Sequence, residues 1–307
     1  MNIGTLINAL PGACAQGLIW GIMAIGVYIT YRILDLADLT VDGTMCTGGA
    51  VCIILLLNGH SVGFSLFCAF CAGMLAGLVT GIFHTAMGIP AILSGILTQL
   101  GLYSINLRIM ANRSNQAISV DKYDLLVSLR YVKNVPFYKN TIFVTILFIV
   151  VITAALYWFF GTELGSSIRA TGSNPNMARA QGINTNASKI LGLMLSNGLV
   201  ALASGLYAQY QGFADVNMGR GAIVIGLAAV IIGQVVFGKI SGNFAFTLVT
   251  VVLGAIIYYL VLQVVLWLGL NSNDLKLLSA LVVAVFLAIP YLKGKYFSKP
   301  VKRGREV

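Results

Sequence analysis

Long apolar stretches separate the charged residues of the chain, and these stretches predict its elements. No acidic or basic side chain precedes Arg32, and residues 43–107 carry only His60 and His84. A membrane-spanning helix needs about 20 mostly apolar residues, and turn residues at 58–61 and 84–90 divide the longest stretch. The pattern predicts helices over 10–30, 43–58, 62–83, 91–110, 141–161, 189–210, 221–237, 243–268 and 276–292.

The predicted fold class is all-α, a polytopic membrane helix bundle of about nine spans, with a range of roughly eight to ten. We treat residues 1–307 as a single transmembrane domain. The predicted helices 43–58 and 221–237 are short for a bilayer crossing, so we expect one or both to be broken or tilted. Glycines spaced four residues apart indicate close helix packing in lipid; they are Gly17 and Gly21, and Gly73, Gly77 and Gly81.

Composition supports a membrane protein and excludes several other classes. Hydrophobic residues make up 58% of the chain and charged residues 9%, whereas soluble domains carry roughly 25% charged residues. This excludes a soluble domain, a disordered tail, a secreted disulfide scaffold and a nucleic-acid-binding domain. The net charge of +10 therefore indicates cytoplasmic loops and anionic lipid. All the cysteines lie in apolar runs of the first quarter, which favours small apolar side chains over a metal or redox site.

The distribution of basic residues predicts the orientation. Eleven basic residues fall on the side of the 162–188 loop and the 293–307 tail, Lys189, Arg32 and Lys239 included, against eight on the opposite side, which includes the basic stretch 108–139. Cytoplasmic segments are the more basic ones. We expect both segments in the cytoplasm, with the N-terminus and the 111–139 loop outside. No positive side chain precedes the first apolar run, so we expect no cleavable signal peptide.

Two segments of the chain resemble each other. Leu36–Thr40 reads Leu-Ala-Asp-Leu-Thr before a glycine-rich helix, and Phe213–Asn217 reads Phe-Ala-Asp-Val-Asn before Gly219 and Gly221. This predicts an inverted repeat with discontinuous short helices beside a translocation path, the first segment on the cytoplasmic side and the second outside. Chance is the alternative for so short a match. The candidate gate residues are Asp38, Thr40, Asp42, Asp215 and Asn217.

Helix capping is the preferred role of these polar residues. Asp38 or Thr40 is placed to accept hydrogen bonds from the free N–H groups of the helix near 43. Asp215, together with Arg220, is expected to do the same for the helix near 221. Both would then shape a gate without contacting substrate.

Catalytic motifs are missing from the sequence. There is no His-Glu-x-x-His, no Gly-x-Ser-x-Gly and no zinc-ligand spacing. Gly233–Lys239 has the spacing of a phosphate loop, but Ile240 stands where magnesium binding requires serine or threonine. We therefore expect no catalytic, metal-binding or cofactor-binding residues, and no enzyme. Since no titratable cluster lies within a span, a proton-coupled carrier is also disfavoured. What remains is transport driven from outside this chain, or a passive pore.

The 165–184 loop is polar and too long for a tight connection. Its Gly-Ser-Asn-Pro turn places Pro175 at a helix start. Residues 175–181 are predicted to form a short amphipathic helix, with Met177 and Ala178 on one side and Arg179 on the other. Such a helix at a membrane surface is a docking element for another protein.

This loop resembles the cytoplasmic signature of ABC-importer permeases of the branched-chain amino acid and ribose type. The matching residues are Gly165, Arg169, Ala170, Gly172, Ala178, Gly182, Ile183 and Asn184. The Asp-Leu-Thr-Val-Asp-Gly stretch from Asp38 to Gly43 resembles the subgroup of aromatic (tryptophan or tyrosine) amino acid permeases. The resemblance covers most of the chain and is weakest over 108–140. It assigns ATPase coupling to Gly165, Arg169, Ala170, Gly172, Asn174, Pro175, Ala178, Arg179, Gly182 and Ile183.

The resemblance implies half of an importer in the bacterial cytoplasmic (inner) membrane. Two permease copies, a homodimer by default and otherwise a heterodimer, would form the pathway within membrane lipid. Two separate ATPase subunits, which bind ATP and magnesium, would drive alternating access. A substrate-binding protein or lipoprotein would deliver the substrate, and no nucleic acid takes part. The implied substrate is an amino acid, with an aromatic one favoured.

Other readings remain open at this stage. They are an ABC permease for a sugar or nucleoside, an ion-gradient-driven secondary transporter, and a structural or receptor membrane protein. Polar residues within the spans could line a pathway, or could instead bond one helix to another. The pathway candidates are Gln99, Asn106, Asn197 and Gln209, with Thr98, Ser204 and Gln234 as further polar positions.

Overall fold

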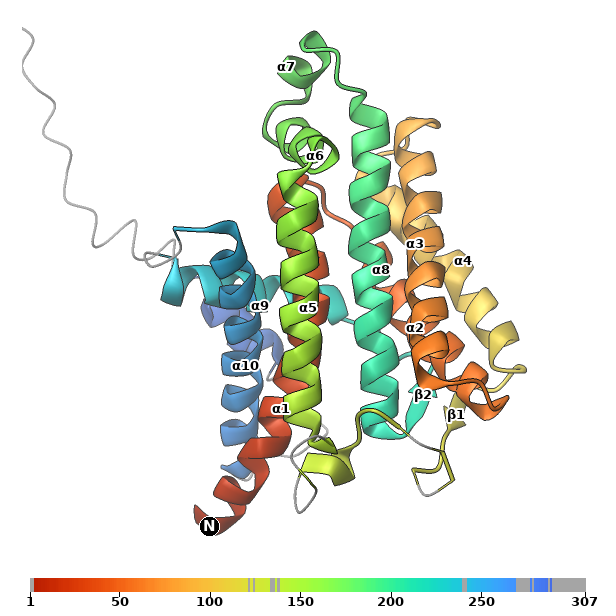
Figure 1. Ribbon diagram of the computed structural model, residues 1–307, viewed down its shortest axis with the longest axis vertical. Helices are drawn as coiled ribbons and strands as arrows, with labels where there is room; N and C mark the ends of the chain where they lie inside the picture. The colour runs from red at the N-terminus through yellow and green to blue at the C-terminus, as the bar shows by residue number, and fades with distance from the viewer. Residues whose placement is uncertain are drawn as a thin grey trace, which may run out of the picture.

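A computed structural model describes residues 3–268, apart from 121, 124, 133–135, 137–138 and 239–241, together with 277, 279–286 and 288. The predicted 293–307 tail lies outside these residues. Of the helix predicted over 276–292, the described residues are helical. The described chain is almost entirely helical, and most helices run along the long axis of the molecule (Figure 1). The predicted all-α fold is confirmed.

Four helices form the first part of the bundle. They are α1 (Ile3–Tyr28), which continues into a π-helical turn, η1 (Ile29–Ile33), followed by α2 (Thr40–Leu57), α3 (Val62–Thr85) and α4 (Ala91–Ile109). The first helix begins well before the predicted residue 10 and includes Pro11. Its end is the π-helical turn through Arg32, the first charged residue of the chain.

The remaining elements complete the bundle and its two ends. They are β1 (Asn115–Ala117), η2 (Leu129–Val132), α5 (Thr141–Gly161), α6 (Glu163–Ser173), α7 (Pro175–Ala180), α8 (Thr185–Gln211), β2 (Phe213–Asp215), α9 (Ala222–Phe237) and α10 (Phe244–Trp267). Helices α6 and α7 lie at one end of the molecule, and the N-terminus, β1 and β2 lie toward the other (Figure 1).

Six described helices are long and apolar enough to cross a membrane: α1 with η1, α2, α3, α5, α8 and α10. Helix α4 is not among them, because Ser94, Thr98, Gln99 and Asn106 lower its hydropathy. Of the two helices predicted to be short, α2 reaches the length of a span and α9 does not.

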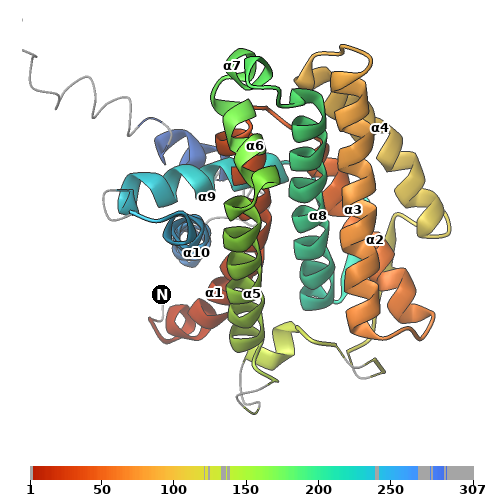
Figure 2. The same cartoon turned by 45° about the horizontal axis from the view of Figure 1, so that its top comes forward.

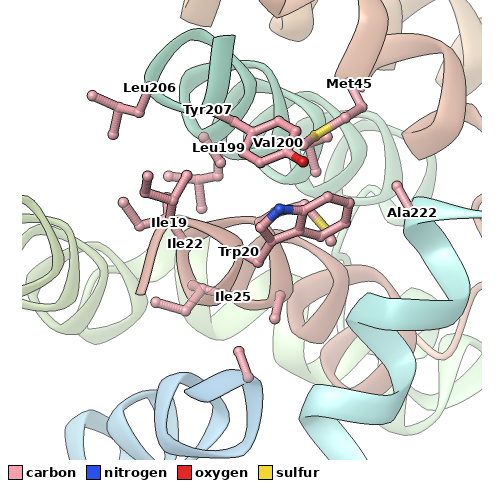
Figure 3. Packing of buried hydrophobic residues seen from close by; sticks show 14 of the residues in the cluster. Ile19, Trp20, Ile22, Ile25, Met45, Leu199, Val200, Leu206, Tyr207 and Ala222 are labelled. Atoms are coloured by element: carbon pink, nitrogen blue, oxygen red, sulfur yellow. The ribbon is translucent and has the colours of Figure 1, made fainter. Parts of the chain in front are cut away.

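The core forms where α1 and α8 cross α2, α9 and α10. Ile19 and Ile22 of α1 lie on the side that faces Leu199 of α8 (Figure 3). Trp20 meets Tyr207 edge to face, with ring centroids 5.3 Å apart. Edge-to-face packing is a favourable geometry for aromatic pairs. The two longest helices thus form a fixed centre for the rest of the bundle.

Glycines allow α3 to lie directly against α8, as their spacing predicts. A Cβ at Gly73 would meet the Asn197 carbonyl oxygen, and one at Gly77 would meet the Leu193 carbonyl oxygen. Gly17 and Gly21 of α1 face α10 in the same way. Close backbone approach of this kind stabilises helix pairs in lipid.

Gly77→Val should destabilise the bundle, because the new side chain has no space against α8. Overpacking of this kind costs about 1–3 kcal/mol, and we expect a lower melting temperature in detergent and less folded protein. The matched control is Gly101→Val in α4, where an added Cβ meets nothing within 4 Å. Equal melting temperatures for the two variants would contradict this packing argument.

The small β-sheet was not predicted. β1 pairs antiparallel with β2, with Asn115 opposite Asp215. The amide N–H of Leu126 also donates to Gln209 Oε1 over 3.2 Å. The 111–139 loop is thereby fastened to the end of α8.

Candidate functional site: the junction of α2 and α9

The chain turns back into the bundle after η1, and Asp38 is buried in this return. Its carboxylate, only 3% exposed, accepts hydrogen bonds from the Thr40 amide at 2.9 Å and from Asn197 Nδ2 at 2.7 Å. A buried carboxylate is costly unless it is hydrogen-bonded. Asp38 thus accepts a hydrogen bond from the N–H of Thr40, the first residue of α2, as predicted. Asp35 and Ala37 just before it are exposed, whereas Asp38 itself is buried.

Hydroxyl groups join four helices beside Asp38. Thr40 Oγ1 lies 2.7 Å from Thr80 Oγ1, which donates to Thr98 Oγ1 over 2.9 Å. Thr44 donates to Asn197 Oδ1 over 2.7 Å. Helices α2, α3, α4 and α8 are therefore bonded together through short polar side chains. In this structure Asn197 connects helices, which is the alternative role considered for the pathway candidates.

Asp42, in the first turn of α2, caps the start of α9. Its carboxylate oxygens accept from the amides of Gly221 and Ile223 over 2.9 and 3.0 Å. An anionic group is favourable there, because a helix N-terminus has free N–H groups and a positive dipole end. The prediction that Asp215 caps this helix is wrong. Asp215 instead accepts from the Asn217 amide over 2.7 Å and from Asn115 Nδ2 over 3.4 Å.

Residues 216–221 pack tightly against the first turns of α2. A Cβ at Gly219 would overlap the Asp42 carbonyl oxygen, so the glycine is required by close approach. Cys46 donates to the Val216 carbonyl over 3.1 Å, and the Gly219 amide lies 3.3 Å from the Cys46 sulfur. We call residues 38–46 together with 216–223 the α2–α9 junction. The two similar sequence segments meet here, an arrangement that an inverted repeat with discontinuous helices accommodates.

A cavity of about 290 Å³ opens at the junction. Its polar lining consists of Asp42, Cys46, Gln99, Tyr103, Asn106 and Arg220. Two predicted pathway residues, Gln99 and Asn106, thus meet a predicted gate residue, Asp42. Sequence reasoning missed Cys46 and Tyr103, and considered Arg220 only as a neighbour of Asp215. The spacing of Gln99, Tyr103 and Asn106 on one face of a helix was the available signal.

The remaining pathway candidates make other contacts. Gln209 accepts from the Leu126 amide and lies 3.5 Å from the Cys52 sulfur. Ser204 donates to the Met45 carbonyl oxygen. Both bond α8 to its neighbours in this structure.

The α6–α7 loop has a defined shape, set by polar caps. Thr162 accepts from the Gly165 amide, and Asn174 Oδ1 accepts from the amides of Asn176 and Met177 over 3.1 Å. Asn184 caps the start of α8 in the same way. The short helix predicted from Pro175 is present as α7, whereas α6 was not predicted (Figure 2).

The prediction that Met177 and Ala178 lie on the same side of α7 is wrong. Met177 is 63% exposed and Ala178 only 2%, so the two do not share an environment. Arg179 folds back, and its Nε donates to Thr185 Oγ1 over 2.9 Å. Arg169 donates to the Phe160 carbonyl oxygen and lies 5.2 Å from the centre of the Phe244 ring. Ala178 and Arg169 therefore hold the loop in place, and Met177 is the apolar group that it presents.

The loop contacts the chain segment that leads to the junction. A Cβ at Gly172 of α6 would overlap the Ile33 carbonyl oxygen. Ile33 ends the π-helical turn, and Asp35, two residues on, has a φ of 54°. Helix α6 therefore packs directly against the end of η1, five residues before Asp38.

The described chain is a helical bundle with a polar junction of two helix starts and a capped loop at one end, and six of its helices are long and apolar enough to cross a membrane. The family of permease components of branched-chain amino acid transport systems matches residues 11–290, and the chain belongs to this family. It is thus a multi-pass membrane protein and the permease component of an ABC-type transporter, not an enzyme.

Individual relatives agree with this assignment. The tyrosine transport system permease protein of Clostridioides difficile (strain R20291) is 41% identical over 92% of this chain and 91% of its own length. An uncharacterized protein of Rickettsia prowazekii (strain Madrid E) is 34% identical over 92% of this chain and 98% of its own length. PsaBC from Streptococcus pneumoniae in complex with Fab shares the fold, with a TM-score of 0.54 at 16% identity over 96% of this chain and 100% of that chain.

Proposed function

We propose that this permease imports an amino acid, with aromatic amino acids as the preferred class, and that separate ATPase subunits drive it. The name of the Clostridioides difficile relative supports the substrate class, as does the Asp38–Gly43 motif. Two copies of the chain form the pathway in the bacterial cytoplasmic membrane, and ATP and magnesium are bound by the partner ATPases. An extracytoplasmic binding protein delivers the amino acid at the end that carries β1 and β2.

The main support for the proposal is the fixed conformation of the α6–α7 loop. Capping residues fix two short helices at the end of the bundle opposite β1 and β2 (Figure 1). Met177 stands exposed on α7, where a partner protein covers it. Gly172 connects this loop to the segment that enters the junction. An ATPase bound to the α6–α7 loop can therefore move the buried residues of the α2–α9 junction through few intervening contacts.

Reconstitution tests the proposal. The permease is purified together with its partner ATPase and binding protein, and placed in liposomes with ATP inside. We expect uptake of radiolabelled L-tyrosine, L-phenylalanine or L-tryptophan that requires both ATP and the binding protein. Uptake driven by an ion gradient without ATP would contradict the proposal, as would uptake of a sugar or nucleoside in place of these amino acids.

Met177→Glu should weaken ATPase docking by roughly tenfold, because a carboxylate replaces an apolar contact at the interface. The measurement is the ATPase that co-purifies with the tagged permease in detergent. The matched control is Leu129→Glu, which changes a side chain of similar exposure, 60% against 63%, in η2 outside the α6–α7 loop. Equal recovery of the ATPase with both variants would show that α7 is not part of the docking surface.

A further inference from the structure

The cavity at the α2–α9 junction combines groups of opposite charge with amide and hydroxyl groups. Asp42 and Arg220 both line it, as do Gln99, Tyr103 and Asn106. Asp42 comes from α2, the amides and the phenol from α4, and Arg220 from the segment before α9. Residues that follow each of the two similar segments, Leu36–Thr40 and Phe213–Asn217, thus line one cavity.

Asn106 supplies an unused hydrogen-bond acceptor at this cavity. The residue is 1% exposed, and its Nδ2 donates to the Gly43 carbonyl over 3.4 Å. Because that carbonyl can only accept, the other amide atom of Asn106 is the oxygen. This Oδ1 has no hydrogen-bond partner in the described part of the chain. A buried acceptor without a partner costs about 1–3 kcal/mol, so a small turn of the Asn106 side chain toward the cavity would let a ligand donate to this oxygen and offset that cost.

Asp42 is fixed but keeps acceptor capacity. Each carboxylate oxygen accepts one backbone N–H from the start of α9, and a carboxylate oxygen has a second lone pair. Together, Asp42 and Asn106 offer acceptors to a group that carries several donors. An ammonium group has three donors and a positive charge, which suits this side of the cavity.

Arg220 gives the cavity a cation with several donors. Its guanidinium matches a carboxylate in shape and charge. Arg220 is exposed and Asp42 is already hydrogen-bonded to the start of α9, so neither charge needs a ligand, but a ligand with one charge would be attracted by only one of them. A zwitterion is attracted by both.

We propose that this cavity binds the zwitterionic head of an α-amino acid, with the ammonium group at Asp42 and Asn106 and the carboxylate at Arg220. Leu100, Val216 and the ring of Tyr103 supply apolar surface for the substrate side chain. A volume of about 290 Å³ is near the lower end for ligand pockets and suits one amino acid. The inference rests on the proposed function, because it names where the imported substrate is held.

The test compares three variants in the reconstituted importer, with initial uptake of radiolabelled L-tyrosine as the readout. Arg220→Gln should lower uptake by roughly tenfold or more, the effect of losing one charge-assisted hydrogen bond. Arg220→Lys keeps the charge and should retain uptake within about threefold of the wild type. Arg113→Gln, an exposed arginine outside the cavity lining, is the matched control and should leave uptake unchanged.

Two further measurements separate binding from folding. Arg220→Gln should co-purify with the ATPase as the wild type does, and its ATP hydrolysis should still be stimulated by the binding protein. Asn106→Leu should lower uptake as well, because it removes the unused acceptor. Wild-type uptake in Arg220→Gln, or equal losses in Arg220→Gln and Arg220→Lys, would overturn the inference. If the wild-type complex itself imports no amino acid, the proposed function fails instead.

Discussion

Replacing Asp42 with alanine should lower uptake by about 100-fold or more and reduce the melting temperature of the permease. The substitution leaves the amides of Gly221 and Ile223 without their acceptor, at about 1–3 kcal/mol each. It also removes an anionic group from the positive end of the α9 dipole. Because the cap is supplied by α2, the loss separates the two sides of the α2–α9 junction.

Thermal melting in detergent and ATP-driven uptake in liposomes measure this effect. Asp42→Asn keeps one side-chain acceptor and should lie between the wild type and Asp42→Ala. The matched control is Asp215→Ala, the aspartate of the second similar segment, whose bonds lie at the exposed β-sheet. If Asp215→Ala lowered uptake as strongly as Asp42→Ala, the α9 cap would have no special role in transport.

Gly172→Val should uncouple ATP hydrolysis from uptake. The new side chain has no space against the Ile33 carbonyl oxygen, so α6 must move away from the end of the first span. The face of α7 that carries Met177 is unchanged, and the ATPase should still dock. We expect ATP hydrolysis to continue while uptake falls by roughly 100-fold, since a small displacement at a coupled site has a large effect on rate.

The measurement is the ratio of substrate imported to ATP hydrolysed in the reconstituted complex. Gly161→Val is the matched control, because an added Cβ at Gly161 meets nothing within 4 Å. It should keep the wild-type ratio. A Gly172→Val variant with a normal ratio would show that the contact between α6 and η1 is not needed to couple ATP hydrolysis to uptake.

Sequence reasoning located most helices, because apolar stretches between charges report burial in lipid directly. It also found the polar loop and the start of α7, since Pro175 and Asn174 are local signals. Capping of α2 by Asp38 was predicted for the same reason, as the donor lies two residues away. Local chemistry was sufficient for these features.

What could not be predicted depends on contacts between distant segments. The cap of α9 was assigned to Asp215, the nearest aspartate upstream, whereas the actual cap comes from α2. Similarly, β1 and β2 are three-residue strands whose pairing joins distant parts of the chain, and neither carries a strand pattern of its own. The different burial of Ala178 and Met177 could not be predicted, because it depends on how α7 packs against α6 and α8.

The pairing of β1 with β2 constrains how this permease can be recombined with its relatives. A chimera that exchanged only the segment 111–139 would place a foreign strand beside the native Phe213–Asp215, which ends five positions before Arg220. Grafts that carry both strands together preserve the register, so the two are best treated as one transplantable unit despite their separation in the gene.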